Sequence, residues 1–456
     1  MRRKALLTEG AIAPLLIRLT LPMILGIFAI MAFNLVDTFF VGRLGSNQLA
    51  AMSFTFPVVL IIASLAMGLG VGASAVVSRA IGEQRENMVR RLTTDSLILA
   101  TLLVVLFVTS GLLTIEPVFR LLGAEPQLLP LIRQYMTIWY LGMPFLVMPM
   151  VGNNAIRATG DTRTPSMVML TAMLVNVIFD PLLIFGIGPF PRLELAGAAI
   201  ATVISRLITF VVALWILYRR ERMITFRPPS SSELLNSWRQ ILYIGLPVAG
   251  TNMITPFTAG FITKLVAVYG ITAVAAYGVA SRIDAFALIV VGALSSVLSP
   301  FVGQNLGARR LDRLRTAVTH SQRFAFLWGL GIFLLLAFLK GPLARLFNDD
   351  PQVIDTITVY LGIVPLAYGL LGVMQLSNTT LNVLGKPLHA TGVILLQMFA
   401  LTIPLALLGS RYFGLIGIFA AAASANTIAG VTSYLWLRRE LGRRSSPLSR
   451  SAPPLR

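Results

Sequence analysis

The sequence predicts an all-α polytopic membrane protein with twelve transmembrane helices in two lobes of six. Three observations predict this fold: a very apolar composition, twelve long apolar stretches, and an internal repeat. Of the 456 residues, 56% are hydrophobic and 12% are charged, and the mean hydropathy is +0.82. Soluble domains carry about 25% charged residues, so most of this chain is expected to lie in lipid.

Charge and rare residue types exclude several classes of protein. The net charge of +19 is carried by short segments between apolar stretches, which favours contact with anionic lipid headgroups over nucleic-acid binding. The chain has no cysteine and two histidines, which excludes disulfides and leaves little room for a metal site. We therefore expect no cofactor, no nucleic-acid partner and no cleavable signal peptide.

Each apolar stretch is long enough to cross a bilayer, which takes about 20 helical residues. Charged turns and turns that contain Gly or Pro separate each stretch from the next. The expected helices, in chain order, are 13–41, 47–78, 89–115, 128–157, 166–187, 195–218, 239–268, 273–303, 317–340, 353–383, 389–409 and 413–437. Prolines inside several of them, Pro22 among them, are candidate kinks.

Charge differences between alternate loops set the expected orientation. One set of loops, together with the residues before the first helix and the residues as far as Arg444 after the last helix, carries 23 Lys and Arg residues, whereas the alternate set carries 6. The positive-inside rule therefore places both termini in the cytoplasm. The expected location is a bacterial-type inner membrane. An even number of helices agrees with this orientation.

The second half of the chain repeats the first at an offset of 225 residues, which aligns Pro22 with Pro247 and Gly82 with Gly307. Matched Pro and Gly residues indicate shared backbone constraints. Six helices separate the copies, so both lobes have the same orientation, as in some alternating-access transporters. The expected domains are an N-lobe (1–218), a cytoplasmic linker (219–238), a C-lobe (239–440) and a cytoplasmic tail (441–456).

Two carboxylates lie inside apolar helices of the first half. Asp37 is the only charged residue of a long apolar run, and Asp180 lies in the fifth expected helix. Both helices run outward, so the two carboxylates reach similar depth. Asn34 and Asn176 precede them by three or four residues on the same helix faces, and Thr202 of the inward-running sixth helix reaches that depth as well.

Insertion of a carboxylate at the centre of a transmembrane helix costs about 2.5–3.5 kcal/mol, which indicates a functional role for such a residue. Removal from water and a neighbouring carboxylate both favour the neutral form, so such a group can take up and release a proton. Oxygen atoms of Asp37, Asn176, Asp180 and Thr202 could instead coordinate Na⁺. The alternative is a structural role, in which each Asp holds helices together by hydrogen bonds.

The second half does not repeat this arrangement. Ile262 stands at the position that corresponds to the first carboxylate. Asp284 lies two residues from Arg282, which we interpret as a local structural charge cluster, and Asp355 lies near a helix end. Lys264 is close enough to the outer end of its helix to reach the interface. Ion coupling is therefore expected in the first lobe.

Candidate substrate contacts also gather in the first half. Most methionines lie there, and flexible Met surfaces accept ligands of varied shape. The candidate substrate-binding residues are Met31, Phe33, Asn34, Asn153, Asn154 and Met173. Ordinary packing explains any single Met equally well, and the paired amides of the fourth helix can instead hold helices together.

Several motifs resemble those of the multidrug and toxic compound extrusion (MATE) transporters. They are Leu21-Pro22 in the first helix, "NLVDTFFVGRLG" (34–45), "NNAIRATGDTRTP" (153–165), "NVIFDP" (176–181) and "GAAIAT" (197–202). Together with the two-lobed repeat, the resemblance extends over nearly the whole chain. Each motif is short, but their order and spacing make the similarity specific.

The resemblance implies export of organic, often cationic drugs in exchange for H⁺ or Na⁺. It implies that the first helix bends at Pro22, and the site is similar to that of the DinF-like branch rather than the NorM-like branch. The residues that it assigns to the cation and proton site are Asp37, Asn176, Asp180 and Thr202. Phe33 stands where the family often has Tyr, so one polar contact is missing.

The resulting hypothesis is a monomeric, proton-coupled antiporter that is not an enzyme. Its expected partners are small-molecule drugs, toxic organic cations and the lipid bilayer, and its coupling ion is H⁺, with Na⁺ as the alternative. A flippase for lipid-linked sugars would need basic residues in its cleft. An intramembrane enzyme would need a nucleophile with a base or a metal, and the two carboxylates lack the flanking motifs of a protease.

Overall fold

The computed structural model describes residues 5–444 and forms this part of the chain from helices and turns alone. The chain divides into two compact units. The first contains Arg18–Ala249 and the residues that precede Thr8, and the second contains Thr8–Ile17 and the chain from Gly250 onward. Most of the predicted tail, residues 445–456, lies outside the described part.

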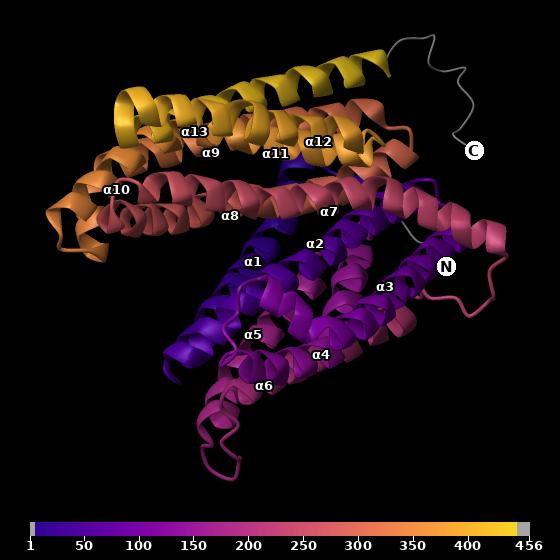
Figure 1. The fold of residues 1–456 in the computed structure, drawn as a ribbon. Coiled ribbons are helices and arrows are strands. Elements are labelled where there is room, and N and C mark those ends of the chain that lie inside the picture. The colour runs from indigo at the N-terminus through magenta and orange to yellow at the C-terminus, as the bar shows by residue number, and fades with distance from the viewer. Residues whose placement is uncertain (1–4, 445–456) are drawn as a thin grey trace. The chain divides into compact units, whose positions relative to one another are not determined.

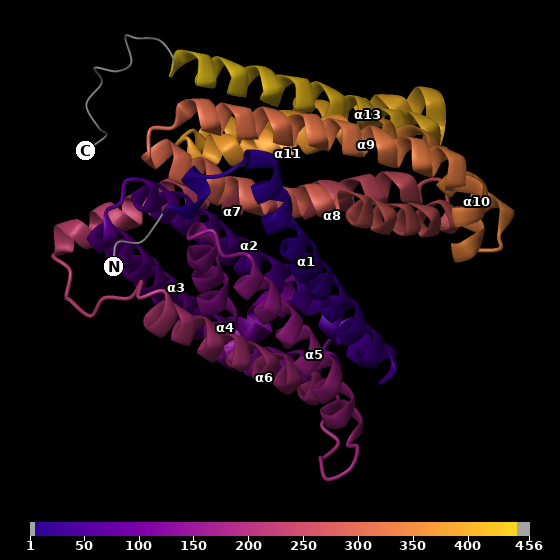
Figure 2. The same cartoon turned by 180° about the vertical axis from the view of Figure 1, so that it is seen from behind.

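Six helices form most of the first unit. They are α1 (Ile12–Gly42), α2 (Ser46–Gly82), α3 (Glu86–Leu121), α4 (Leu129–Ala158), α5 (Arg163–Phe185) and α6 (Glu194–Trp215), and α6 ends in a π-helical turn, Ile216–Arg220. Helix α4 packs against α2, α3 and α6, and α5 packs against α6. Figures 1 and 2 show α4 alongside α6 from opposite directions. The candidate carboxylates lie on α1 and α5.

The second unit begins within α7 (Ser231–Ala267). Its other helices are α8 (Ile271–Gly307), α9 (Leu311–Phe347), α10 (Pro351–Ile363), α11 (Tyr368–Val383), α12 (Pro387–Leu395) and α13 (Ile403–Arg443). A 3₁₀ turn, Val364–Ala367, joins α10 to α11, and a π-helix, Leu396–Thr402, joins α12 to α13. Helix α11 packs against α8, α9 and α13 (Figure 1), as α4 packs within the first unit.

The helix bounds confirm the predicted repeat. Helix α2 covers residues 46–82 and α8 covers 271–307, so both ends differ by 225 residues. The same offset relates the starts of α3 and α9, at residues 86 and 311, and the ends of α4 and α11, at residues 158 and 383. Two copies of one helical unit therefore form the two lobes.

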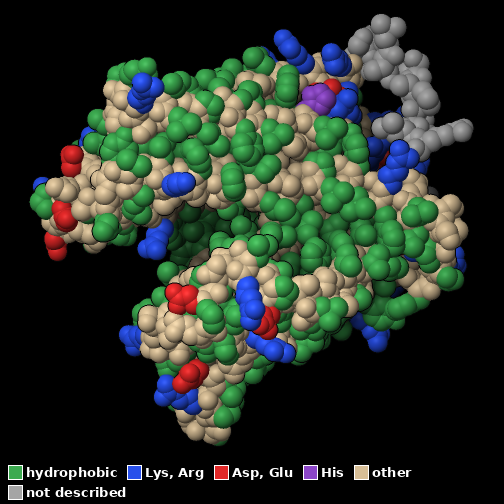
Figure 3. All heavy atoms as spheres, viewed as in Figure 1, with side chains coloured by type: hydrophobic (Ala, Val, Ile, Leu, Met, Phe, Trp, Pro, Cys, Tyr) green, Lys and Arg blue, Asp and Glu red, His purple; other side chains and the backbone are tan. Residues whose placement is uncertain are grey.

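Twelve membrane crossings agree with the described helices. Ten helical stretches are long and apolar enough to cross a membrane. The last of them, Pro387–Arg443, turns back at Gly414, whose φ of 61° belongs to the left-handed region, and so contributes two crossings. Helix α7 completes the set. Hydrophobic and uncharged side chains cover most of the face drawn in Figure 3, as contact with lipid requires.

The predicted linker is partly helical and packs on the first unit. Helix α7 begins at Ser231, inside the predicted segment 219–238, and the first unit extends to Ala249. The Trp238 indole N–H donates to the Asp95 backbone oxygen of α3 at 3.0 Å. Gly68 of α2 approaches Gly245 of α7 so closely that a side chain at residue 68 would lie 2.3 Å from the Gly245 oxygen. These contacts hold the first part of α7 against the first unit.

Candidate ion-coupling site in the first unit

Asp37 lies on the buried face of α1. Its side chain is 6% exposed, and Phe33, one turn earlier, is 5% exposed. Asn34, which we expected beside Asp37, is instead exposed. At about 3.6 residues per turn, a residue four positions away lies about 40° from Asp37 around the helix, whereas one three positions away lies about 60° away on the other side. The buried stripe of α1 follows the four-residue spacing.

Asn176 and Asp180 form a buried pair on α5. Both are fully buried, and the Asn176 amide N–H donates to the Asp180 carboxylate oxygen Oδ1 at 2.9 Å. Their spacing of one helical turn places the two side chains on the same face, as predicted. Pro181 follows directly inside the helix and cannot donate a backbone hydrogen bond. This hydrogen bond fixes the orientation of the amide and leaves one oxygen of each group free.

The two carboxylates belong to one site. Asp37 and Asp180 interact electrostatically, and the buried Tyr135 of α4 interacts with both. Three buried oxygens in this group have no hydrogen-bond partner among the described residues: Asp37 Oδ1, Asn176 Oδ1 and Asp180 Oδ2. Buried oxygens without partners are rare in folded proteins because each one carries a desolvation cost. Such oxygens are acceptors for a proton or ligands for a hard cation.

Arg206 of α6 brings a positive charge to the same site. Its guanidinium lies 4.7 Å from the centre of the Phe33 ring and interacts electrostatically with Asp37. Its buried Nε has no hydrogen-bond partner among the described residues. Burial of a charged nitrogen without a partner is costly, so Arg206 is available to an acceptor that is not part of the described chain.

Two residues of this site, Arg206 and Tyr135, were not predicted, although the sequence contains a signal for each. Arg206 is the only charged residue in the predicted helix 195–218, and a charge inside an apolar helix indicates a functional site just as the two carboxylates do. Tyr135 matches Tyr360 in the repeat, and in the second unit Tyr360 contacts a carboxylate. The first half is therefore not purely acidic at depth, which weakens the charge argument against an anionic substrate.

Three further predicted residues lie close in sequence to members of this site but make no hydrogen bond to the carboxylates within the described residues: Thr202, Met31 and Met173. All three are half-buried. Thr202 lies one turn before Arg206 on α6, and its hydroxyl makes no hydrogen bond to the carboxylates in the described structure. Their assigned roles therefore remain predictions.

The paired amides of α4 have different surroundings. Asn154 donates to the Met150 backbone oxygen at 2.7 Å and accepts from Arg157 at 2.6 Å. A side chain at Gly70 of α2 would lie 2.4 Å from the Asn154 amide nitrogen. Asn154 thus packs α4 against α2, which is the structural alternative to substrate binding. Asn153 is also buried, but its amide oxygen has no partner among the described residues.

Pro22 lies inside α1, which continues as one helix past it. Proline removes a backbone hydrogen bond and so weakens the helix at this point. One turn later, a side chain at Gly26 would lie 3.0 Å from the Met169 sulfur of α5, so α1 touches α5 closely there. Among the described helices, close backbone approaches to α1 are limited to isolated points such as this one.

The interpretation of Asp284 as a charge cluster with Arg282 is wrong. Asp284 of α8 accepts hydrogen bonds from the hydroxyls of Tyr360, at 2.5 Å, and Tyr368. Arg282 is exposed. Two residues along a helix turn by about 200°, so these side chains leave opposite faces of α8. Lys264 and Asp355 form no ion pair within the described residues.

A family model described as MatE matches residues 22–182 and 247–408, one segment in each half of the chain. A protein from Shewanella oneidensis, named as an FAD transporter, is 41% identical over 433 residues, which are 95% of this chain and 96% of that protein. The Bacillus subtilis protein named as probable multidrug resistance protein YoeA is 26% identical and covers 90% of this chain and 91% of its own.

Solved structures agree with these similarities. The crystal structure of the Vibrio cholerae MATE transporter VcmN in the bent form matches with a TM-score of 0.89 and 31% sequence identity. The match covers 95% of this chain and 98% of the VcmN chain. The arrangement of helices is therefore shared over the whole length, including both repeats.

Proposed function

We propose, since the chain belongs to the MatE family of multi-pass membrane transporters and is not an enzyme, that it exports organic drugs in exchange for protons. The proposed coupling site consists of Asp37, Asn176 and Asp180. No cofactor takes part in this proposal, and H⁺ is the coupling ion. The protein acts as a monomer in the bacterial inner membrane with both termini in the cytoplasm.

One observation carries the proton-coupling proposal. Asp37 Oδ1, Asn176 Oδ1 and Asp180 Oδ2 are buried acceptors without hydrogen-bond partners among the described residues. Protonation of one carboxylate supplies a donor for a neighbouring acceptor and removes part of the repulsion between Asp37 and Asp180. The buried group is therefore stabilised when it takes up a proton, and that uptake changes its hydrogen bonds.

The transport cycle follows from this change. With both carboxylates ionised, the first lobe binds its cargo. Protonation from outside removes charge, rearranges the hydrogen bonds of Asp37 and bends α1 at Pro22, where the helix lacks a backbone hydrogen bond. The cargo then leaves, the transporter returns to its inward-facing state, and the proton is released inside.

Na⁺ is the alternative coupling ion. The free oxygens of Asp37, Asn176 and Asp180 are hard ligands, and the Thr202 hydroxyl would add a fourth. A cation site and a proton site make opposite demands on the carboxylates, because Na⁺ requires them ionised. Separate gradients therefore distinguish the two.

The test uses the purified transporter in proteoliposomes with a fluorescent cationic dye as cargo. We expect efflux of the dye with an imposed pH gradient, no efflux with a Na⁺ gradient alone, and loss of pH-driven efflux in Asp37→Asn and Asp180→Asn. Asp355→Asn is the matched control, because Asp355 is exposed near the start of α10. Full pH-driven efflux by Asp37→Asn would contradict the proposal. Dye efflux driven by a Na⁺ gradient alone would show that Na⁺, and not H⁺, is the coupling ion.

FAD is the second candidate cargo, and two observations favour it. The protein with 41% identity is named as an FAD transporter, and Arg206 has a buried nitrogen free to contact a phosphate oxygen. The same proteoliposomes loaded with FAD test this cargo. The comparison is made at a pH where dye efflux is maximal in both proteins. FAD efflux that Arg206→Gln reduces about tenfold there, with maximal dye efflux unchanged, would assign FAD to this transporter. A lipid-linked sugar, the third candidate, finds no support among these relatives.

A further inference from the structure

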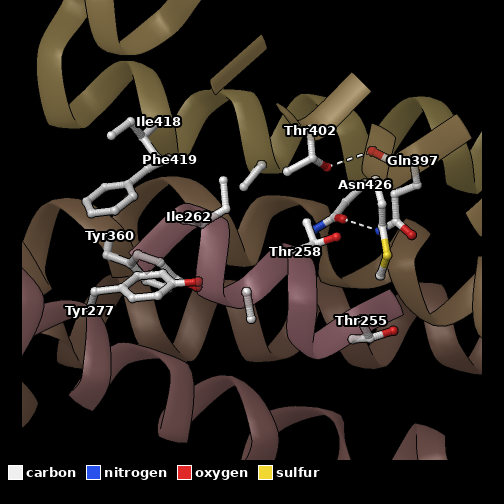
Figure 4. Close-up of a pocket in the computed structure, with 13 residues that line it drawn as sticks. Thr255, Thr258, Ile262, Tyr277, Tyr360, Gln397, Thr402, Ile418, Phe419 and Asn426 are labelled. Atoms are coloured by element: carbon white, nitrogen blue, oxygen red, sulfur yellow. Dashed lines mark hydrogen bonds between the residues drawn. The ribbon is translucent and has the colours of Figure 1, made fainter. Parts of the chain in front are cut away.

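A cavity in the second unit has no part in the proposed coupling site. Its volume is about 150 Å³, and its walls come from α7, α8, α10, the π-helix Leu396–Thr402 and α13 (Figure 4). None of the residues that line it is charged. A cavity of this size is large enough for one benzene-sized ring and is too small for a whole drug-sized molecule.

One end of the cavity is aromatic. Figure 4 shows Tyr277, Tyr360 and Phe419 gathered there. Tyr360 stands edge-to-face with both neighbours, at 6.0 Å from the Tyr277 ring centre and 4.9 Å from that of Phe419. The Tyr360 hydroxyl donates to the Asp284 carboxylate at 2.5 Å, which fixes this ring and enriches it in electrons. Such an aromatic wall favours an electron-poor planar ring.

The other end of the cavity carries two amides. The Gln397 amide nitrogen donates to the Asn426 amide oxygen at 2.6 Å. An amide pair joined by one hydrogen bond always leaves one carbonyl oxygen and one NH₂ group available, whichever amide donates. Neither group has another hydrogen-bond partner among the described residues. The pair therefore presents an acceptor next to a donor.

The backbone around Gln397 is π-helical and not α-helical. Gln397 belongs to the π-helix Leu396–Thr402, and Pro404 follows in α13. Proline cannot donate the backbone hydrogen bond that an α-helix would require, and a π-helical turn accommodates this loss. The Thr402 hydroxyl donates to the Gln397 backbone oxygen at 2.7 Å and holds the wider turn. Such π-helical segments occur frequently at functional sites.

We propose that this cavity binds the edge of a planar heteroaromatic ring that carries an N–H donor beside a carbonyl acceptor, as the pyrimidinedione end of a flavin does. The ring stacks near Tyr277 and Tyr360, and its edge pairs with the Gln397 and Asn426 amides. This proposal deepens the proposed function, because it assigns the aromatic part of an exported cargo to the second unit. Binding at this cavity does not require the proton-coupling site.

Equilibrium binding to the purified, detergent-solubilised protein tests the proposal. The probe is riboflavin, which has no phosphate and therefore does not engage Arg206 through one. We expect saturable quenching of flavin fluorescence, and about tenfold weaker binding to Gln397→Leu and Tyr277→Leu. N3-methylated riboflavin, which lacks the edge donor, should bind wild type about as weakly as riboflavin binds Gln397→Leu.

Matched controls separate this site from folding and from transport. Gln352→Leu and Tyr412→Leu change the same residue types at exposed positions of the second unit and should bind as wild type does. Tyr277→Phe keeps the ring and should retain binding if Tyr277→Leu fails to fold. Asp37→Asn should lose pH-driven efflux but keep riboflavin affinity, so failure of coupling is distinguishable from failure of this site. Absent riboflavin binding, or equal affinity in Gln397→Leu and Gln352→Leu, would overturn the proposal.

Discussion

Arg206 places a positive charge beside the carboxylate that we propose takes up protons. Its guanidinium lies over the Phe33 ring, interacts electrostatically with Asp37 and forms no ion pair with it within 4.0 Å in the described structure. A nearby positive charge that forms no ion pair with Asp37 stabilises its ionised form without neutralising it. Arg206 therefore lowers the free energy of the buried Asp37 carboxylate and still allows this carboxylate to take up a proton.

We predict that Arg206→Gln raises the pH at which dye efflux is half-maximal, by about one unit. Without the nearby positive charge, the neutral form of Asp37 is relatively more stable, so the proton binds at a lower proton concentration. The measurement is efflux against external pH in proteoliposomes. Arg133→Gln, at an exposed position of α4, is the control. An unchanged or lower midpoint in Arg206→Gln would show that this charge does not act on the coupling carboxylate.

A charged residue inside an apolar helix can be recognised in the sequence. Which face of a helix is buried, and which distant residues it contacts, depends on the packing of the helices. Asp37 and Asp180 stand out because each is a carboxylate in an apolar helix. Asn34 was expected beside Asp37, but the buried stripe of α1 follows Phe33 instead. The two positions differ by about 100° around the helix, and only the packing of α1 decides which one is buried. Asp284 illustrates the same limit, because its tyrosine partners are distant in sequence.

Helix α3 contains two ion pairs of the same type in different surroundings. Arg91 contacts the fully buried Asp95 one turn later and also donates to the Arg227 backbone oxygen at 2.9 Å. Glu116 pairs with Arg120 at the same spacing, but both side chains are at least 49% exposed. The Asp95 pair therefore ties α3 to the segment that leads into α7, whereas the Glu116 pair lies at a solvated surface.

We predict that Asp95→Ala destabilises the transporter strongly and Glu116→Ala does not. Removal of Asp95 costs up to about 3 kcal/mol, because Arg91, whose side chain is only 17% exposed, loses its compensating charge. An exposed pair contributes about 0.2–1 kcal/mol. Thermal unfolding in detergent measures both, and Asp95→Ala should melt well below Glu116→Ala. Equal melting temperatures would mean that α3 is not held to the linker through Asp95.

Helices were predicted well as elements, because long apolar stretches between charged turns define their extent. The turn of α13 at Gly414 lies next to the boundary predicted between 389–409 and 413–437, whereas the π-helix that precedes Pro404 was not predicted. Gly409 and Gly417 approach so closely that a side chain at residue 417 would lie 2.0 Å from the Gly409 oxygen. This hairpin needs small residues on both helices, which could be recognised only once their pairing was known.

The two lobes share one backbone plan but differ in chemistry. Helix α2 matches α8 residue for residue at an offset of 225, and Tyr135 occupies the position of Tyr360. In the first unit, Tyr135 lies near two carboxylates with free oxygens, whereas in the second unit Tyr360 and Tyr368 donate to both oxygens of Asp284. A repeated scaffold therefore holds one carboxylate site with free acceptors and one that is satisfied.

This difference predicts that proton coupling depends on the first lobe alone. Asp284→Asn should keep the pH dependence of efflux unchanged, because the Asp284 oxygens already accept two hydrogen bonds and need no proton. The same variant should weaken riboflavin binding severalfold, because Tyr360 loses the acceptor that fixes its ring. Proton uptake per exported molecule, measured with a pH-sensitive dye inside proteoliposomes, distinguishes the lobes: it should fall in Asp37→Asn and not in Asp284→Asn. A loss of proton uptake in both variants would mean that the satisfied carboxylate also titrates during transport, and coupling would then belong to both copies of the repeat.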